Sequence, residues 1–321
     1  SYTINREIKG ANAMNKKIIV GVLAAAILVG VFSYILLTPS IFPQKQRCAV
    51  IVVVSGLQVK TFEKYSFPVI GELKQYGVYL HGTSGQFGGD TNTVHVLPEI
   101  VTATSFNKLS SLGYSIKMPP WSAGIPEPIP EEIEEIFEVF HRHNYRVGIF
   151  VNSEEDVILN MIKRPVDIYQ VEESPSYPQT RDYVLMRNYI ATLTASNQKL
   201  VDGTCKFIEG HHSQSFVILL TINLIDHVGH VVGSHPTSSV YYIEAIKKVF
   251  NGFIPQVVQS LKDNKCWDHS VFGVISSFGY RDRILAARPM GAHFYGWDDP
   301  LVNTVIWVLA VPDGKLKQLL T

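Results

Sequence analysis

The stretch Cys48-Ala-Val-Ile-Val-Val-Val54, followed by Ser55-Gly56, decides the fold. It is an unbroken apolar run made largely of β-branched residues. Such a run is typical of a strand that is buried on both faces of a parallel sheet, because a strand with one solvated face would alternate apolar and polar residues. The pair Ser55-Gly56 ends the run at a turn. The sequence therefore predicts a central parallel strand at 48–54.

Similar patterns recur along the chain and alternate with amphipathic segments. Strands are expected at 78–80, 147–151, 216–223, 271–277 and 304–310, and helices at 62–75, 131–143, 184–208 and 241–261. The last helix is expected to be interrupted or kinked at Gly252 and Pro255. Segment 152–182 is polar and contains prolines, which predicts irregular structure. This alternation predicts an α/β fold with a doubly wound, mainly parallel sheet flanked by helices, and ligands at the carboxyl ends of the strands.

Length and charge limit the classes of protein that this chain can represent. Its 321 residues, 46% of them hydrophobic, suffice for one α/β domain of roughly 250 residues plus an accessory segment. Lys plus Arg and Asp plus Glu each number 28, so the formal charge is zero. No nucleic-acid partner is expected, because nothing suggests a basic surface.

An uncharged run of 20 residues from Ile18 to Leu37 predicts a transmembrane helix, since about 20 residues span the hydrocarbon of a bilayer. A cleaved signal peptide and a buried helix are the alternatives. The expected division is an N-terminal segment at 1–17, the membrane helix at 18–37, a linker at 38–47 and the α/β domain at 48–321. The sequence thus predicts a single-pass membrane protein.

Basic residues set the expected orientation, because Arg6, Lys9, Lys16 and Lys17 all precede the span. They place the N-terminus on the cytoplasmic or matrix side and the α/β domain on the opposite side. The chain contains no N-x-S/T acceptor, so the endomembrane system, the cell surface and the mitochondrial inner membrane all stay open. The expected partners are the lipid bilayer and other membrane-protein subunits.

The chain has three cysteines, Cys48, Cys205 and Cys266, which are too few for a disulfide framework and lack the spacing of a zinc site. A bridge between Cys205 and Cys266 in an oxidising compartment is one alternative. Three buried free thiols are the other.

Candidate metal ligands follow the strand expected at 216–223. Asp226, His227 and His230 come directly after it, and His293 precedes the strand at 304–310. Carboxylate oxygen and imidazole nitrogen are usual zinc ligands. By spacing alone the pattern is weak, because such residues also form hydrogen-bonded loops.

The stretch DHVGHVVG at 226–233 resembles the D-x-x-G-H-x-x-G motif of ectonucleotide pyrophosphatase/phosphodiesterases and the related glycolipid ethanolamine-phosphate transferases, which belong to the alkaline-phosphatase superfamily. The resemblance runs from about Ala49 to Pro312. TVHVLPEIVTA at 93–103 is similar to the family's nucleophile helix, T-x-P-N-x-x-x-I-V-T-G, and residues 121–129 resemble W-x-x-G-x-P-x-x-I. ISSFG at 275–279 stands where the family has S-D-H-G.

The resemblance implies two zinc ions that flank a threonine nucleophile. One zinc site maps onto Asp226, His230 and His293, so one zinc is the expected cofactor. The positions of the second site read Ser55, Ser277 and Phe278. A serine hydroxyl is a weak neutral ligand and a phenyl ring has no lone pair, so the resemblance implies a degenerate metal centre.

The nucleophile position maps onto Thr93, where the threonine would be a relict, and the asparagine of the motif is replaced by Val96. Without the second cation its hydroxyl would stay protonated near neutral pH. A plain helix N-cap is the alternative role for Thr93 or the nearby Thr91.

Three hypotheses follow. The leading one is a catalytically inactive, phosphodiesterase-like subunit of a membrane assembly. The second is a phosphodiesterase, nucleotide pyrophosphatase or phosphoethanolamine transferase that works with a single metal. The third is a module that binds a phosphate or glycan head group in the relict pocket without turnover.

Overall fold

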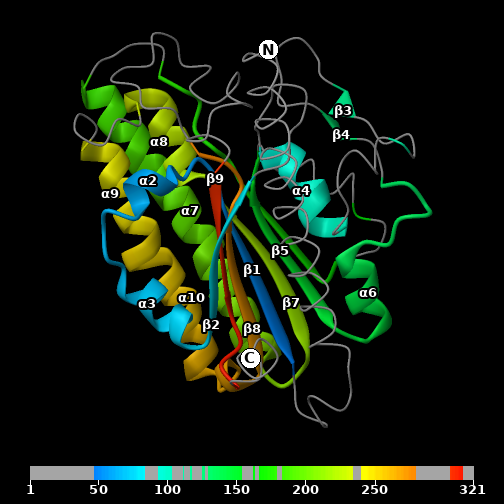
Figure 1. The fold of residues 1–321 in the computed structure, drawn as a ribbon. Helices are drawn as coiled ribbons and strands as arrows, with labels where there is room; N and C mark the ends of the chain where they lie inside the picture. The colour runs from blue at the N-terminus through cyan, green and yellow to red at the C-terminus, as the bar shows by residue number, and fades with distance from the viewer. Residues whose placement is uncertain are drawn as a thin grey trace, which may run out of the picture.

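A computed structural model gives the fold of the chain (Figure 1). It describes residues 47–83, 93–102, 111, 116–117, 125–126, 129–153, 162, 166–178, 183–233, 240–279 and 304–313. Within these residues a seven-stranded sheet has the order β2-β9-β8-β1-β7-β5-β6, and a small second sheet pairs β3 with β4. The strands are β1 (Cys48–Val54), β2 (Gly77–Thr83), β3 (Ile116–Lys117), β4 (Ile125–Pro126), β5 (Arg146–Asn152), β6 (Ile168–Glu172), β7 (Phe216–Ile222), β8 (Ser270–Ser276) and β9 (Thr304–Ala310).

The large sheet is mainly parallel, as the sequence predicts. Strand β1 lies at its centre and pairs in parallel with both β7 and β8, and β5 pairs in parallel with β7 and β6. Strand β9 is antiparallel to both of its neighbours, β8 and β2. The carboxyl ends of β8, β1, β7, β5 and β6 therefore lie along one edge of the sheet.

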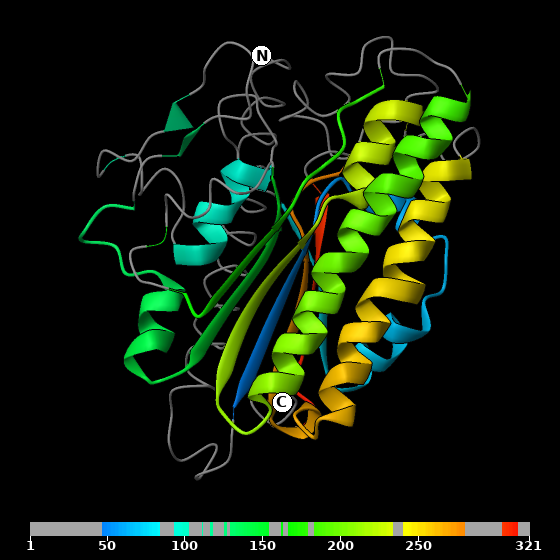
Figure 2. The same ribbon diagram turned by 180° about the vertical axis from the view of Figure 1, so that it is seen from behind.

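Helices cover both faces of the sheet, as Figures 1 and 2 show. Helices α4 (Thr93–Thr102) and α6 (Ile136–Arg142) lie on one face. The other face carries α2 (Val59–Phe62), α3 (Pro68–Gln75), α7 (Tyr183–His211), α8 (Leu224–Val232), α9 (Val240–Lys248) and α10 (Ile254–Asp263). This is the doubly wound arrangement that the sequence predicts.

The core explains why β1 is apolar throughout. Every residue of β1 is buried. Val50, Val52 and Val54 belong to the larger hydrophobic cluster, which includes residues of α7 and α10. Ala49, Ile51 and Val53 belong to the second cluster, with residues of α4 and α6. Both faces of the strand are thus removed from water, which confirms the interpretation of the apolar run.

Two expectations at the level of single elements were wrong. Segment 152–182 contains the edge strand β6, which the sequence did not indicate because its five residues, IYQVE, mix apolar and polar side chains and none of them is fully buried. Backbone pairing with β5 holds this strand in the sheet. The helix expected at 62–75 is two helices, α2 and α3, and Pro68 stands at the first position of α3, where a missing N–H costs nothing.

The interruption expected in helix 241–261 is confirmed. A π-helical turn, η2 (Val249–Phe253), joins α9 to α10 and contains Gly252. Pro255 follows in the first turn of α10. Proline has no N–H to donate to the preceding turn, which accounts for the change of hydrogen-bond register at this point.

The predictions for the N-terminal region lie outside the described residues, namely 1–17, the span at 18–37 and the linker up to residue 46. Among the residues that the structure does describe, no helix combines the length and the apolar character needed to cross a bilayer. Cys48, Cys205 and Cys266 are all free thiols in the structure.

Candidate functional site

Three neighbouring strands end together at the carboxyl edge of the sheet. Ser276 of β8, Val54 of β1 and Ile222 of β7 lie in register. The backbone continues this register by one residue, because the Ser277 amide donates to the Val54 carbonyl and the Ser55 amide donates to the Ile222 carbonyl, both at 3.0 Å. Positions of both predicted metal sites therefore converge on one edge.

Helix α8 begins directly after β7 and carries the two described ligands of the first predicted site. The sequence placed Asp226 and His230 in a strand-end loop, whereas both lie on this helix, four residues apart and so on one face. Their side chains are 13% and 6% exposed, and Asp226 Oδ1 lies 3.6 Å from His230 Nε2. Two donors of a tetrahedral zinc ion at its usual bond lengths are roughly 3.3 Å apart. The pair therefore fits two ligands of one zinc ion.

His227 has a different role from the neighbours with which the sequence grouped it. Its Nδ1 lies 2.7 Å from Tyr189 Oη and its Nε2 lies 3.2 Å from Asn223 Nδ2. The Asn223 amide has a fixed orientation, because its Oδ1 accepts from Asn197 Nδ2 at 3.0 Å. Nε2 of His227 must therefore accept, and Nδ1 donates to Tyr189. With both nitrogens engaged in a fully buried ring, His227 anchors α8 rather than presenting a ligand.

Tyr177 covers this group of residues from the segment that follows β6. Its ring stacks on His227 with centroids 5.0 Å apart and meets His230 edge-on at 5.4 Å. Ser174, from the same segment, accepts a hydrogen bond from Asn223 Nδ2 at 3.0 Å. Sequence reasoning missed Tyr177 and Ser174, because their segment has neither helical nor strand periodicity.

The positions of the second predicted metal site, unlike the Asp226–His230 pair, carry no ionisable side chain and are fully buried. Ser55, Ser277 and Phe278 are each at most 1% exposed, and Phe278 belongs to the larger hydrophobic cluster. These residues offer hydroxyl groups and a phenyl ring in a dry environment, so they do not fit a divalent cation. Across the described part of the chain, no group of three or more His, Cys, Asp or Glu side chains could hold a metal ion.

The remaining predicted residues are described only in part. Thr93 is the first residue of α4, at the position where the resemblance places the nucleophile. Its side chain is not among the parts of the chain that the structure describes. His293, the third predicted ligand, also lies outside the described residues.

Asn152 adds a polar group that the sequence analysis did not single out. It is the last residue of β5, at the same carboxyl edge, and it is fully buried. Neither its Nδ2 nor its Oδ1 has a hydrogen-bond partner within the structure as described. An unpaired buried amide costs about 1–3 kcal/mol per group, which a bound polar group or water would offset.

Comparison with known proteins rests on structure. No protein-family model matches the chain, and no curated protein sequence matches it. Solved structures do match. An inactive variant of murine ectonucleotide pyrophosphatase/phosphodiesterase 5, in complex with AMP, is 15% identical with a TM-score of 0.50, covering 73% of this chain and 57% of that one.

Two further matches come from other hydrolases. BT1596, a 2-O GAG sulfatase, is 11% identical with a TM-score of 0.51, covering 84% of this chain and 65% of that one. The phosphonate monoester hydrolase of Agrobacterium radiobacter is 10% identical with a TM-score of 0.50, covering 83% of this chain and 68% of that one.

The chain has the alkaline-phosphatase fold. This is the fold that the resemblance implied, and at these identities the structural matches show the fold alone. The chain spans 57% of the length of the murine phosphodiesterase that it matches. The chemistry of this alkaline-phosphatase-like domain must therefore be argued from its own residues.

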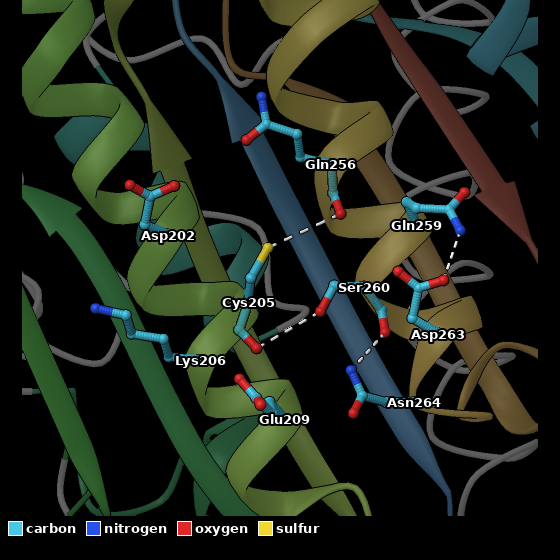
Figure 3. Close-up of a pocket in the computed structure, with 9 residues that line it drawn as sticks. All are labelled: Asp202, Cys205, Lys206, Glu209, Gln256, Gln259, Ser260, Asp263 and Asn264. Atoms are coloured by element: carbon cyan, nitrogen blue, oxygen red, sulfur yellow. Dashed lines mark hydrogen bonds between the residues drawn. The ribbon is translucent and has the colours of Figure 1, made fainter.

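A hollow elsewhere in the alkaline-phosphatase-like domain lies between α7 and α10 (Figure 3). It measures about 570 Å³ and is lined by Asp202, Cys205, Lys206, Glu209, Gln256, Gln259, Ser260, Asp263 and Asn264. The lining residues on α7 come from its C-terminal half, which ends just before β7 begins, and the others come from α10 and the residue that follows it. The hollow is therefore near the amino ends of the parallel strands, away from the candidate site.

Proposed function

We propose that this protein is a catalytically inactive, phosphodiesterase-like protein that is anchored in a membrane and acts as a structural or interaction subunit of a membrane assembly. The observation that carries the proposal is the environment of Ser55, Ser277 and Phe278. These residues occupy the carboxyl ends of the two adjacent strands β1 and β8, and all three are buried. No charged side chain stands at these three positions.

A nucleophile at Thr93 would lack the groups that activate it. An alcohol attacks a phosphoryl group readily only when a metal ion or a base lowers its pKa, and two-metal sites provide one ion for the attacking oxygen and one for the leaving oxygen. Phe278 fills the place of a ligand with a phenyl ring that packs in the core. A hydroxyl at Thr93 would then stay protonated, so phosphoryl transfer through it is not expected.

The first predicted metal site supports a remaining role in binding one metal ion. Asp226 and His230 fit two ligands of one zinc ion, and His293 is proposed as the third. A bound zinc would supply Lewis-acid chemistry at this edge. The chain's own residues hold the pair in place, because His227, Asn223 and Tyr189 fix helix α8 through hydrogen bonds.

The membrane role is proposed from the uncharged run at 18–37, with the N-terminus on the cytoplasmic or matrix side. An exposed apolar patch supports the subunit role. Tyr183, Val184 and Leu185 begin α7, Val240 begins α9, and the four side chains are at least half exposed. The two helix starts are neighbours, because the rings of Tyr183 and Tyr241 lie 6.2 Å apart. Apolar side chains grouped on a surface are typical of contacts between proteins.

The experiment uses the full chain, purified in detergent, with an activated phosphodiester as substrate and zinc added in increments. We expect turnover no higher than that of the His230→Ala variant, and at most one bound zinc per chain by elemental analysis. Turnover that is lost in His230→Ala would instead support the single-metal enzyme. Two bound zinc ions would contradict the proposal outright.

A single-metal phosphodiesterase or phosphoethanolamine transferase is the second candidate, and the 3.6 Å separation of Asp226 and His230 favours it. The third candidate is a module that binds a phosphate or glycan head group without turnover. The side-chain amide of Asn152, which has no hydrogen-bond partner within the described structure, favours this candidate. Two measurements separate these candidates: equilibrium dialysis with a non-hydrolysable phosphate ester for binding, and an assay with an activated phosphodiester for turnover. Saturable binding of the first without turnover of the second supports the binding module, whereas turnover of the second supports the enzyme.

A further inference from the structure

The amino edge of the sheet, opposite the candidate site, holds a buried cysteine. Cys48 is the first residue of β1 and lies between Phe216 of β7 and Ser270 of β8, with which it is in register. It is fully buried. Cys48 is also the first residue after the predicted linker at 38–47, so it stands where the domain would connect to its membrane helix.

A second cysteine is brought to the same edge by the turn after α10. Lys265 takes a left-handed conformation with φ 59°, and the Cys266 amide donates to the Leu261 carbonyl at 2.8 Å, which closes the helix. Cys266 lies four residues before Ser270, the strand partner of Cys48. The end of α10 and the start of β8 therefore fix where the Cys266 side chain lies.

The contacts of the Cys266 sulfur confirm this location. Its Sγ lies 3.9 Å from the carbonyl oxygen of His212, in the loop that leads into β7. Phe216, the first residue of β7, is the other strand partner of Cys48. Cys266 is thus flanked by the starts of both strands that flank Cys48, and both cysteines belong to the same hydrophobic cluster.

The two thiols are hydrogen-bonded to each other. This hydrogen bond, together with burial, raises the pKa of the Cys48 thiol and lowers the pKa of the Cys266 thiol. The two thiols are therefore in contact at this edge. In thiol–disulfide exchange the thiolate is the attacking species, and a second thiol in contact with the first can then complete the bridge.

Cys205 lies in another environment, as Figure 3 shows. Its Sγ approaches the Gln256 carbonyl at 3.8 Å, and its own carbonyl accepts from Ser260 Oγ at 3.5 Å. Cys266 Sγ contacts the carbonyl of His212, just after the end of α7, and from Cys205 to that end α7 rises on the order of 9 Å. The Cα atoms of a disulfide lie within about 7 Å, so Cys205 is not placed to pair with Cys266.

We propose that Cys48 and Cys266 form a disulfide when the domain folds in an oxidising compartment, and that Cys205 stays a free thiol. One of the two protein thiolates attacks a small-molecule disulfide such as oxidised glutathione, which releases one glutathione thiolate and leaves a mixed disulfide. The other protein thiolate then attacks the protein sulfur of that mixed disulfide and displaces the second glutathione thiolate. The two protein thiols are oxidised to one disulfide, and the reagent is reduced to two thiols. Because both cysteines are buried in the folded domain, the exchange occurs before the edge closes.

The bridge has a structural consequence that does not depend on the proposed function. It ties the strand that follows the predicted membrane linker to the turn at the end of α10. A covalent link between positions 48 and 266 closes a loop of most of the domain, which restricts the unfolded chain strongly. The bridge also reports the compartment, because disulfides persist only where the environment is oxidising.

The test counts thiols in the full chain, purified in detergent and incubated with oxidised glutathione during refolding. Free thiols are blocked with N-ethylmaleimide, the chain is digested without reduction, and the peptides are identified by mass spectrometry. We expect a linked pair of peptides containing Cys48 and Cys266, with the alkyl group on Cys205. Blocking of all three cysteines, or a bridge that includes Cys205, would overturn the proposal.

Thermal unfolding supplies a second readout with matched variants. The oxidised wild type should unfold about 5 °C or more above the reduced wild type. Cys205→Ser should keep this difference and Cys48→Ser should lose it. If Cys48→Ser does not fold, the comparison of oxidised with reduced wild type remains decisive, since equal Tm values would contradict a stabilising bridge.

Discussion

The two halves of the sheet's carboxyl edge differ in what they bury. Beyond β7, helix α8 presents Asp226 and His230, supported by the hydrogen-bonded side chains of His227, Asn223 and Tyr189. Beyond β1 and β8, the chain buries Ser55, Ser277 and Phe278 instead. One half carries a carboxylate and an imidazole side by side, and the other is buried and uncharged.

This difference has a physical reason. A buried carboxylate without a cation carries a large desolvation cost, so acidic ligands are unfavourable once a metal is no longer bound. Hydroxyl groups and a phenyl ring carry no such cost. The α8 half avoids it differently, because the Asp226 side chain stays partly exposed and His230 lies beside it. The fold persists in both halves because buried apolar strands, rather than metal ions, stabilise the sheet.

Removing the phenyl ring should have the largest effect on stability. Phe278→Ala is expected to lower the free energy of unfolding by about 3–5 kcal/mol, because it leaves a cavity in the core. Urea unfolding of the variant and the wild type measures this. Val240→Ala is the control, since Val240 is 69% exposed and should change stability by about 0.5 kcal/mol or less. A cost below about 1 kcal/mol for Phe278→Ala would show that this half of the edge is not core.

Breaking the anchor of α8 should have the next largest effect. His227→Ala leaves the Tyr189 hydroxyl and the Asn223 amide without their partner, and should lower the free energy of unfolding by about 1–3 kcal/mol. His141→Ala, on the exposed surface of α6, should be nearly neutral. Equal effects of the two substitutions in urea unfolding would mean that the His227 network does not stabilise this half.

Zinc binding tests the α8 half directly. His230→Ala should weaken zinc binding at least tenfold, or about 1.4 kcal/mol, because it removes one proposed ligand. Isothermal titration of zinc into the metal-free protein measures the change, with His141→Ala as the control. Unchanged affinity in His230→Ala would place any bound zinc elsewhere and leave the Asp226–His230 pair a structural feature.

Removing the salt bridge between Arg146 and Asp167, near the amino ends of the parallel strands, should change the free energy of unfolding least. Burial disfavours the ionised Asp167 carboxyl, but hydrogen bonds from the Val147 amide and the Arg146 guanidinium outweigh it and lower its pKa below 3.8. A lowered pKa in the folded state means that the stabilisation is present at neutral pH and is lost as the pH falls through that pKa. Solvent screening limits it to about 1 kcal/mol or less.

The measurement is urea unfolding of Asp167→Asn and the wild type as a function of pH. The variant should be slightly less stable at pH 7, and the difference should disappear under strongly acidic conditions. A difference that persists or grows in acid would have the wrong sign for a lowered pKa.

Most of the fold was predictable from the sequence, and the reason is burial. Strands β1, β7, β8 and β9 are nearly uniform apolar runs because helices cover both faces of the sheet. The edge strand β6 was missed because its position leaves it partly exposed, so its five residues do not form the continuous apolar run that marks the central strands. The identity of an edge strand depends on which strand it pairs with, and local sequence does not encode that.

The candidate site was predictable in part. The D-x-x-G-H motif identified Asp226 and His230, and the structure places them 3.6 Å apart. The motif did not separate His227 from them, since that distinction depends on Tyr189 and Asn223, residues 38 positions upstream and four positions upstream along the chain. Tyr177 and Asn152 had no signal at all, because a stacked ring and an unpaired amide are defined only by their neighbours.

The sequence by itself determined the α/β class, the positions of the buried strands along the chain and the absence of charged side chains at 55, 277 and 278, because apolar periodicity and side-chain chemistry are local properties. Only the tertiary structure decided that Phe278 belongs to the core, that His227 is an anchor and that Cys266 meets Cys48 rather than Cys205. Each of these depends on contacts between residues far apart in the chain, which form only when the sheet brings its strand ends together.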